Sequence, residues 1–244
     1  MSQLPTPWRN TTQDLAPVQR PPVEAGAYDL YPSFAVAHDS IQSGFDSLAT
    51  ALVGESIIVA DGFVGVFWED FRTNLDAALR DRDISPTWIS VEDALRPSAE
   101  IDTLIEPFLG GDDPIFGTRF TGNLRDFFHQ DALEALQPPT RADMTILYGC
   151  GAALANWPGR LLYIDLPKNE LQFRSRAGSI ANLGAAGPAE PKPMYKRFYF
   201  VDWVALNHHK EALLPQIDLI VDGQRPEMPV WMHGETLRSG LAEM

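Results

Sequence analysis

The sequence predicts an α/β fold in which a mainly parallel sheet is flanked by helices, and three observations support this prediction. Short runs of apolar, β-branched residues, such as Ser-Ile-Ile-Val-Ala at 56–60, are typical of strands buried on both faces. Segments with apolar residues at helical spacing alternate with these runs, as crossover helices between parallel strands require. The chain has 244 residues, 45% of them hydrophobic and 21% charged, which is enough apolar material for a core under such a sheet.

The expected elements follow one another in an order that fits this fold. A helix is expected over residues 39–53, where apolar side chains recur at helical spacing from Ile41 to Leu52. The strand at 56–60 leads through a glycine-bearing loop into an amphipathic helix over 68–79. The remaining elements are a strand at 87–91, helical segments at 91–95 and 99–108, a short helix at 127–136, strands at 144–148 and 161–165, a helix at 166–176, an extended run at 197–201, a helix at 205–214 and a last strand at 217–221.

Residues 1–26 differ in composition from the rest of the chain. They are rich in Pro, Gln, Thr and Asn and hold little that can be buried, which predicts an extended arm. Two interpretations remain open: a disordered leader, or an arm that packs on a partner subunit of a homo-oligomer. Residues 27–244 are predicted to form a single domain.

Charge and composition exclude several classes of function. The net charge is −14, from 33 acidic and 19 basic residues, which argues against nucleic acid and anionic membranes as partners. Cys150 is the single cysteine, so an internal disulfide and a cysteine-based zinc cluster are excluded. No apolar run reaches 18 residues, and residues 1–20 lack the apolar segment of a secretory signal. We therefore expect a cytoplasmic protein without a metal site.

The loop after the first strand, Asp61-Gly62-Phe63-Val64-Gly65-Val66-Phe67-Trp68, is the first candidate site. Ligands of parallel sheets bind at the carboxyl ends of the strands, and a helix N-terminus suits an anion. Gly62, Gly65 and Val66 are therefore candidates for binding phosphate, and Asp61 is a candidate base or magnesium ligand. The loop lacks the lysine and the hydroxyl of a Walker A motif. A glycine turn that only packs the helix on the sheet, with Asp61 as a strand-end cap, remains the alternative.

Other strand ends supply further candidates. Arg174 and Arg176 could close over phosphates, or they could be a solvated helix end. The strand at 144–148 ends without a carboxylate, and Cys150 is expected to be structural. Adjacent His208 and His209 point in different directions on a helix, so surface histidines are expected there and not metal ligands. The remaining pocket candidates are Gly149, Gly151, Lys196, Arg197 and Asp202.

Several phrases of the sequence carry a resemblance to known families. They are Tyr28-Asp29-Leu30-Tyr31-Pro32, Gly62-x-x-Gly65-Val66-x-Trp68, Lys196-Arg197-Phe198-Tyr199-Phe200-Val201-Asp202-Trp203 and Asp222-Gly223-Gln224-Arg225-Pro226. With the order of elements, they make residues 28–240 resemble the P-loop kinase superfamily, nearest its uridine kinase-like branch. More specifically, this region is similar to the kinase-like region in front of the cupin domain of some bacterial class I mannose-6-phosphate isomerases. In this resemblance 56–68 stands at the phosphate loop, 143–149 at the Walker B strand and 162–176 at the strand and lid.

The resemblance implies a three-layer P-loop kinase-like fold with degenerate Walker motifs and a role in carbohydrate metabolism. It implies a small phosphorylated ligand, a nucleotide or a sugar phosphate, and a cupin-type isomerase domain or subunit as partner. No cofactor is certain, and a magnesium-bound nucleotide is the one it suggests. Because the Walker A lysine, its hydroxyl and the Walker B acid are missing, ordinary ATP-dependent kinase activity is not expected. The metal-binding histidines of a cupin are also missing, so we expect no isomerase activity from this chain by itself.

Three functions are therefore weighed. The first is a kinase-like domain that binds a nucleotide or sugar phosphate without transferring phosphate. The second is an active sugar or nucleoside phosphotransferase with an unconventional phosphate loop. The third is an assembly module that binds no small ligand.

Overall fold

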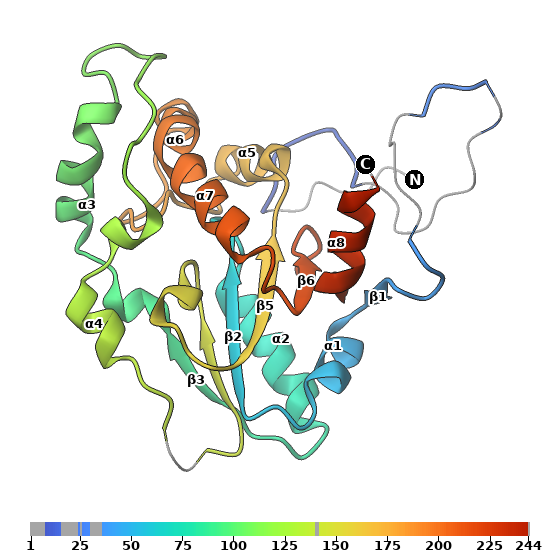
Figure 1. Cartoon of the computed structure of the whole chain (residues 1–244). Coiled ribbons are helices and arrows are strands. Elements are labelled where there is room, and N and C mark those ends of the chain that lie inside the picture. Colours follow the sequence, from blue (N-terminus) through green and yellow to red (C-terminus); the bar gives the residue numbers. More distant parts are fainter. Residues whose placement is uncertain (1–7, 16–23, 25, 30–35, 140–141, 244) are drawn as a thin grey trace.

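The computed structural model describes residues 8–15, 24, 26–29, 36–139 and 142–243 (Figure 1). Its centre is a seven-stranded sheet with the order β1-β7-β6-β5-β2-β4-β3. The five strands from β6 to β3 are parallel, and β7 and β1 join the β6 edge in antiparallel pairing. The strands are β1 (Gln42–Ser43), β2 (Ile57–Gly62), β3 (Thr87–Ser90), β4 (Thr145–Tyr148), β5 (Arg160–Asp165), β6 (Leu219–Asp222) and β7 (Val230–His233).

Helices cover both faces of this sheet. Side chains of α1 (Phe45–Leu52) and α2 (Trp68–Arg80) share one apolar cluster with one face of the strands. Five helices share the apolar cluster on the opposite face. They are α3 (Ser98–Ile105), α4 (Gln130–Ala135), α5 (Lys168–Arg176), α6 (Pro191–Arg197) and α7 (Trp203–Leu213), while α8 (Gly234–Ala242) contacts β6 and β7.

The strand β2 shows why the sequence specifies two cores. Its apolar side chains alternate between the faces, so Ile58 and Ala60 pack toward α1 and α2, and Val59 packs into the opposite cluster. Both neighbours of β2 are parallel strands, with Val59 opposite Leu147 of β4 and Leu161 of β5. Burying an aliphatic side chain of this size stabilises the fold by about 1.5–3 kcal/mol. A continuous apolar run is therefore needed at this central position.

The predicted α/β class and mainly parallel sheet are confirmed, with two differences. The expected extended run at 197–201 is wrong, because the chain is helical there: α6 continues into a π-helix, Phe198–Asp202. Aromatic and β-branched residues imitate a strand in that segment, but the fully buried Phe198 and Val201 belong to a helical face. The second difference concerns elements at the sheet edge and the surface: residues 42–43 of the helix expected over 39–53 form β1, α1 begins only at Phe45, and β7, α6 and α8 were not expected.

The structure describes part of the proline-rich arm, residues 8–15 and 24, and the rest of 1–26 lies outside the described residues except Gly26. The described part near Trp8 contacts α5 and the loop after β2 of this same chain. No described helix is long and apolar enough to cross a membrane.

Candidate functional site

The carboxyl end of β2 is the topological switch point of the sheet. The chain runs from β2 to β3 and β4 on one side and then crosses to β5 on the other. Loops that leave in opposite directions open a crevice at such a point, and ligands of parallel α/β sheets bind there. In Figure 1 this end of β2 and β5 points toward α5 and α7.

A cavity of about 430 Å³ lies at this end of the sheet, on the β4 and β3 side. Four segments line it, and each follows a strand or α5. They are residues 64–68 after β2, Glu92, Leu95 and Arg96 after β3, Cys150 after β4, and residues 179–185 after α5. The sequence-predicted residues Gly65 and Val66 are in this lining, whereas Gly62, Arg174 and Arg176 are not.

The loop at the floor of the cavity leaves several backbone groups unpaired. The N–H groups of residues 64–67 make no hydrogen bond within the described part of the chain. They precede α2, whose 13 residues place the positive end of the helix dipole here. Gly65 has φ +87°, and a Cβ at this position would collide with Leu171. Glycine is therefore required by both conformation and packing.

Asp61 has the surroundings of a structural cap. Its side chain is fully buried. Oδ1 accepts hydrogen bonds from the N–H groups of Gly62 (2.6 Å) and Gly151 (2.9 Å), and Oδ2 accepts one from Ala153 (2.9 Å). Nε2 of His209 lies 2.8 Å from Oδ2. Asp61 thereby ties the loops after β2 and β4 to α7, and the role of base or magnesium ligand stays a prediction.

His209 is where the expectation of surface histidines is wrong. Its side chain is only 8% exposed and pairs with Asp61, whereas the neighbouring His208 is exposed and lies 3.1 Å from Arg119. The 100° rotation between adjacent helical residues separates the two fates. A pattern that places one of two adjacent histidines toward the sheet could have identified this contact.

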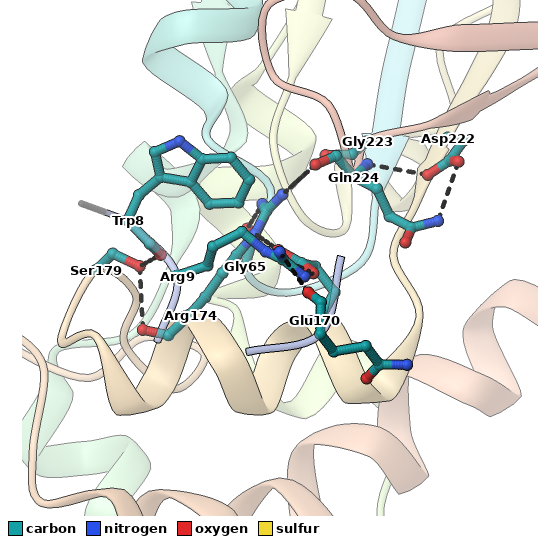
Figure 2. Close-up of polar contacts among 10 residues, drawn as sticks. Trp8, Arg9, Gly65, Glu170, Arg174, Ser179, Asp222, Gly223 and Gln224 are labelled. Carbon is teal, nitrogen blue, oxygen red and sulfur yellow. Dashed lines mark hydrogen bonds and ion pairs between the residues drawn. The ribbon is translucent and has the colours of Figure 1, made fainter. Parts of the chain in front are cut away.

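Arg174 is a buried connector between three segments (Figure 2). Its guanidinium donates to the carbonyls of Gly65 (2.7 Å) and Gly223 (2.9 Å) and lies 3.4 Å from Glu170. Burial lowers the pKa of Arg174 to about 10, partly offset by the charge of Glu170, so it stays protonated at neutral pH. Arg176 is exposed, lies over the Phe173 ring and lines a different cavity. The structure therefore brings Arg174, but not Arg176, to the loop after β2.

A buried polar network holds the opposite wall of the cavity. Asp202 is fully buried and accepts from Asn182 (2.6 Å) and Arg197 (3.3 Å), while Arg197 also donates to the carbonyl of Leu183. Burial raises the pKa of Asp202, and the charge of Arg197 opposes that rise. Because Asn182 and Leu183 line the cavity, this network fixes its wall. Lys196 is not part of it and donates to the carbonyl of Asp113 at the surface.

Glu92 and Cys150 are the titratable groups of the lining whose pKa is shifted. Burial, with the charges of Glu69 and Asp93, raises the pKa of Glu92. Burial raises the pKa of the Cys150 thiol well above its ordinary value, which agrees with a structural cysteine. Among the lining residues Glu92 is the one carboxylate, so no carboxylate pair converges on the cavity. The described residues contain no group of three His, Cys, Asp or Glu that could hold a metal.

The chain matches one family over most of its length. The family model of the domain of unknown function DUF8485 matches residues 44–244. The chain belongs to this family. The match begins one residue before α1 and includes all five parallel strands.

Comparisons with other proteins add little about function. No curated protein matches the chain. Among solved structures, one described as a "putative fructose transport system kinase" from Silicibacter sp. TM1040 is similar at 14% identity, covering 67% of this chain and 94% of that one. Its TM-score is 0.40, which is too low to support a function for this chain.

Proposed function

We propose that this chain is a kinase-like domain that binds a small phosphorylated ligand, a nucleotide or a sugar phosphate, without ordinary phosphoryl transfer. The observation that carries the proposal is the 430 Å³ cavity at the switch point, with unpaired backbone N–H groups at the positive end of α2. Such groups bind the oxygen atoms of phosphate without a cationic side chain.

The absence of transfer follows from what surrounds the loop. Phosphoryl transfer needs cations on the transferred group and a carboxylate for magnesium. Val66 and Phe67 follow Gly65, at the positions where a Walker A motif has its lysine and hydroxyl. Asp61 is occupied by three N–H groups and His209 and does not line the cavity. These features favour binding over catalysis.

The class of ligand comes from the resemblance to kinase-like regions of mannose-6-phosphate isomerases. It supports a role in sugar metabolism in the cytoplasm, beside a cupin-type isomerase. Sugar phosphates therefore head the ligands to be tested. An assembly module remains the second candidate, because the aromatic Phe67 and Trp68 fill part of the loop's surroundings.

A thermal-shift screen tests the proposal. The ligands are mannose 6-phosphate, fructose 6-phosphate, ATP and GTP with and without Mg²⁺, and the free sugars. A ligand that binds only the folded state raises the free energy of unfolding, by about 2.7 kcal/mol at a ligand concentration of a hundred times Kd. The midpoint temperature of unfolding rises as a result. We expect a shift with a phosphorylated ligand and none with its free sugar.

Two neighbouring alanines provide a matched pair of variants. Ala185 lines the cavity, whereas Ala186 is exposed and does not. Ala185→Trp is expected to abolish the shift, and Ala186→Trp is expected to keep it. Loss of the shift in both variants, or no shift with any ligand at millimolar concentration, would contradict the proposed site and favour an assembly module.

A further inference from the structure

A short N-terminal segment, residues 8–13, lies beside α5 and the loop after β2, and Figure 2 shows Trp8 and Arg9 next to Arg174, Glu170 and Ser179. It has no regular secondary structure, yet it makes specific contacts with residues more than 50 positions away in the sequence. The segment therefore belongs to the folded domain through individual side-chain and backbone contacts and not through a helix or strand of its own.

Arg9 anchors the segment to α5 by an ion pair. Its Nε and Nη2 lie 3.2 Å and 2.9 Å from the two carboxylate oxygens of Glu170. The side chains are 10% and 1% exposed, so the pair is shielded from water. Glu170 also faces Arg174, which makes a buried Arg–Glu–Arg triad. One backbone bond, from the N–H of Asn10 to the carbonyl of Phe173 (3.0 Å), fixes the segment along the helix.

Trp8 connects this anchor to the cavity. The guanidinium of Arg174 lies 4.9 Å from the centre of the Trp8 ring and 4.3 Å from that of Phe67, and the two rings meet edge to face. The hydroxyl of Ser179 donates to the carbonyl of Trp8 (2.7 Å). Phe67 and Ser179 both line the cavity, on different walls. Trp8 therefore contacts both walls at once, from outside.

We propose that residues 8–13 are a detachable latch that holds the two walls together and so controls access to the cavity. The described contacts of the segment are with α5, Phe67 and Ser179, and none of them is part of the sheet, so the segment can open while the sheet stays folded. When it opens, Phe67 and Ser179 lose Trp8 as a common partner and keep Arg174, and the loops at 64–67 and 179–185 separate more readily. The proposal deepens the proposed function, because the latch then regulates the ligand site: a ligand that prefers the closed cavity must also tighten the latch.

The single cysteine allows a test that needs no ligand. Cys150 is buried and lines the cavity, so its rate of modification by 5,5′-dithiobis(2-nitrobenzoate) measures opening. We expect Arg9→Ala in the full chain to raise this rate about tenfold, which is the factor that loss of a charge-assisted hydrogen bond gives. Trp8→Ala removes the ring contacts with Arg174 and Phe67 but keeps the carbonyl that accepts from Ser179, so we expect a smaller rise in its rate. Arg82→Ala is the matched control, since Arg82 also ties two elements together, α2 and α1, on the other face of the sheet. Its rate is expected to stay at the wild-type value.

Amide hydrogen exchange separates opening from general loosening. In the latch variants we expect faster exchange at residues 64–67 and 179–185 and unchanged exchange in β2, β4 and β5. Unchanged Cys150 rates in both variants, or equal acceleration in the sheet, would overturn the latch. Neither measurement involves a phosphorylated ligand, so failure of the ligand screen leaves this result interpretable, and failure of the latch leaves the screen interpretable.

Discussion

The carboxyl edge of the sheet divides at β2 into two halves that are built differently. On the β4 and β3 side there is a cavity with unpaired backbone N–H groups and one carboxylate, Glu92. On the β5 and β6 side, the charged groups have partners: Lys210 lies 3.0 Å from Asp165, and Arg174 bonds the carbonyl of Gly223. On the β5 and β6 side, charged groups therefore link segments of the fold, whereas on the β4 side the backbone N–H groups of residues 64–67 have no partner among the described residues.

The strongest way to break this comparison is to remove Arg174. Arg174→Ala leaves Glu170 without its neighbour on α5 and leaves the carbonyls of Gly65 and Gly223 unpaired. Glu170 keeps its pair with Arg9, so the cost comes from the two buried carbonyls left without a donor, at about 1–3 kcal/mol each. We expect a loss of this size in the free energy of unfolding by urea.

Arg176→Ala is the control for this prediction. Arg176 is exposed, two residues along the same helix, and its substitution should change stability by no more than about 0.5 kcal/mol. If both substitutions lower the free energy of unfolding by the same amount, Arg174 is not the connector that its contacts suggest. The view that charged groups hold the β5 and β6 side of the sheet edge together would then lose its main evidence.

A smaller loss of stability is expected for a substitution of Asp61, at the end of β2 where the two halves meet. In Asp61→Asn an amide group replaces one oxygen, so a nitrogen that cannot accept faces a backbone N–H. Leaving one buried donor unpaired costs about 1–3 kcal/mol, which urea unfolding can resolve. The control is Asp165→Asn, because that carboxylate is partly exposed and its partner among the described residues is Lys210, an interaction worth about 0–1 kcal/mol. Wild-type stability of Asp61→Asn would return Asp61 to the candidates for catalysis.

The two halves also differ in how much of them could be predicted from the sequence. The parallel strands are continuous apolar runs, so their type was predictable. The last of them, Leu219–Asp222, begins two residues and ends one residue after the range expected from the sequence. The loop at Gly65 was predictable as a feature of the strand-to-helix junction, because a glycine there signals a close approach.

The contacts on the β5 and β6 side of the sheet edge were not predictable, because they join residues far apart in the chain. Arg174 and Arg176 are equivalent in sequence, and only the packing of α5 buries one and exposes the other. The partners of Asp61 come from the loop after β4 and from α7, about 90 and 148 residues away. Hydrophobic periodicity assigns an element but not the register with which its polar side chains meet another element.

The smallest predicted effect on stability concerns Glu92, the carboxylate that lines the cavity on the β4 and β3 side. Because burial raises its pKa, the folded state binds a proton more tightly than the unfolded state, and stability falls as pH rises above the ordinary pKa of about 4.3. Glu92→Gln removes this penalty. The variant should therefore have a higher Tm than the wild type at pH 7, and the difference should vanish near pH 4.

Glu69→Gln sharpens this last prediction, because the sign is reversed. A hydrogen bond from Arg72 lowers the pKa of Glu69, so its charged form stabilises the fold, and that contribution is lost as pH falls. Glu69→Gln should lower Tm slightly at pH 7, where Glu92→Gln raises it. In this comparison among the described residues, Glu69 is the paired carboxylate and Glu92 is the unpaired one.

Glu92→Gln should also strengthen binding of a phosphorylated ligand in the thermal-shift screen, since it removes a negative charge from the cavity. If Glu92→Gln has a lower Tm than the wild type at pH 7, the Glu92 carboxylate is paired. The contrast between the two sides of the sheet edge would then be wrong.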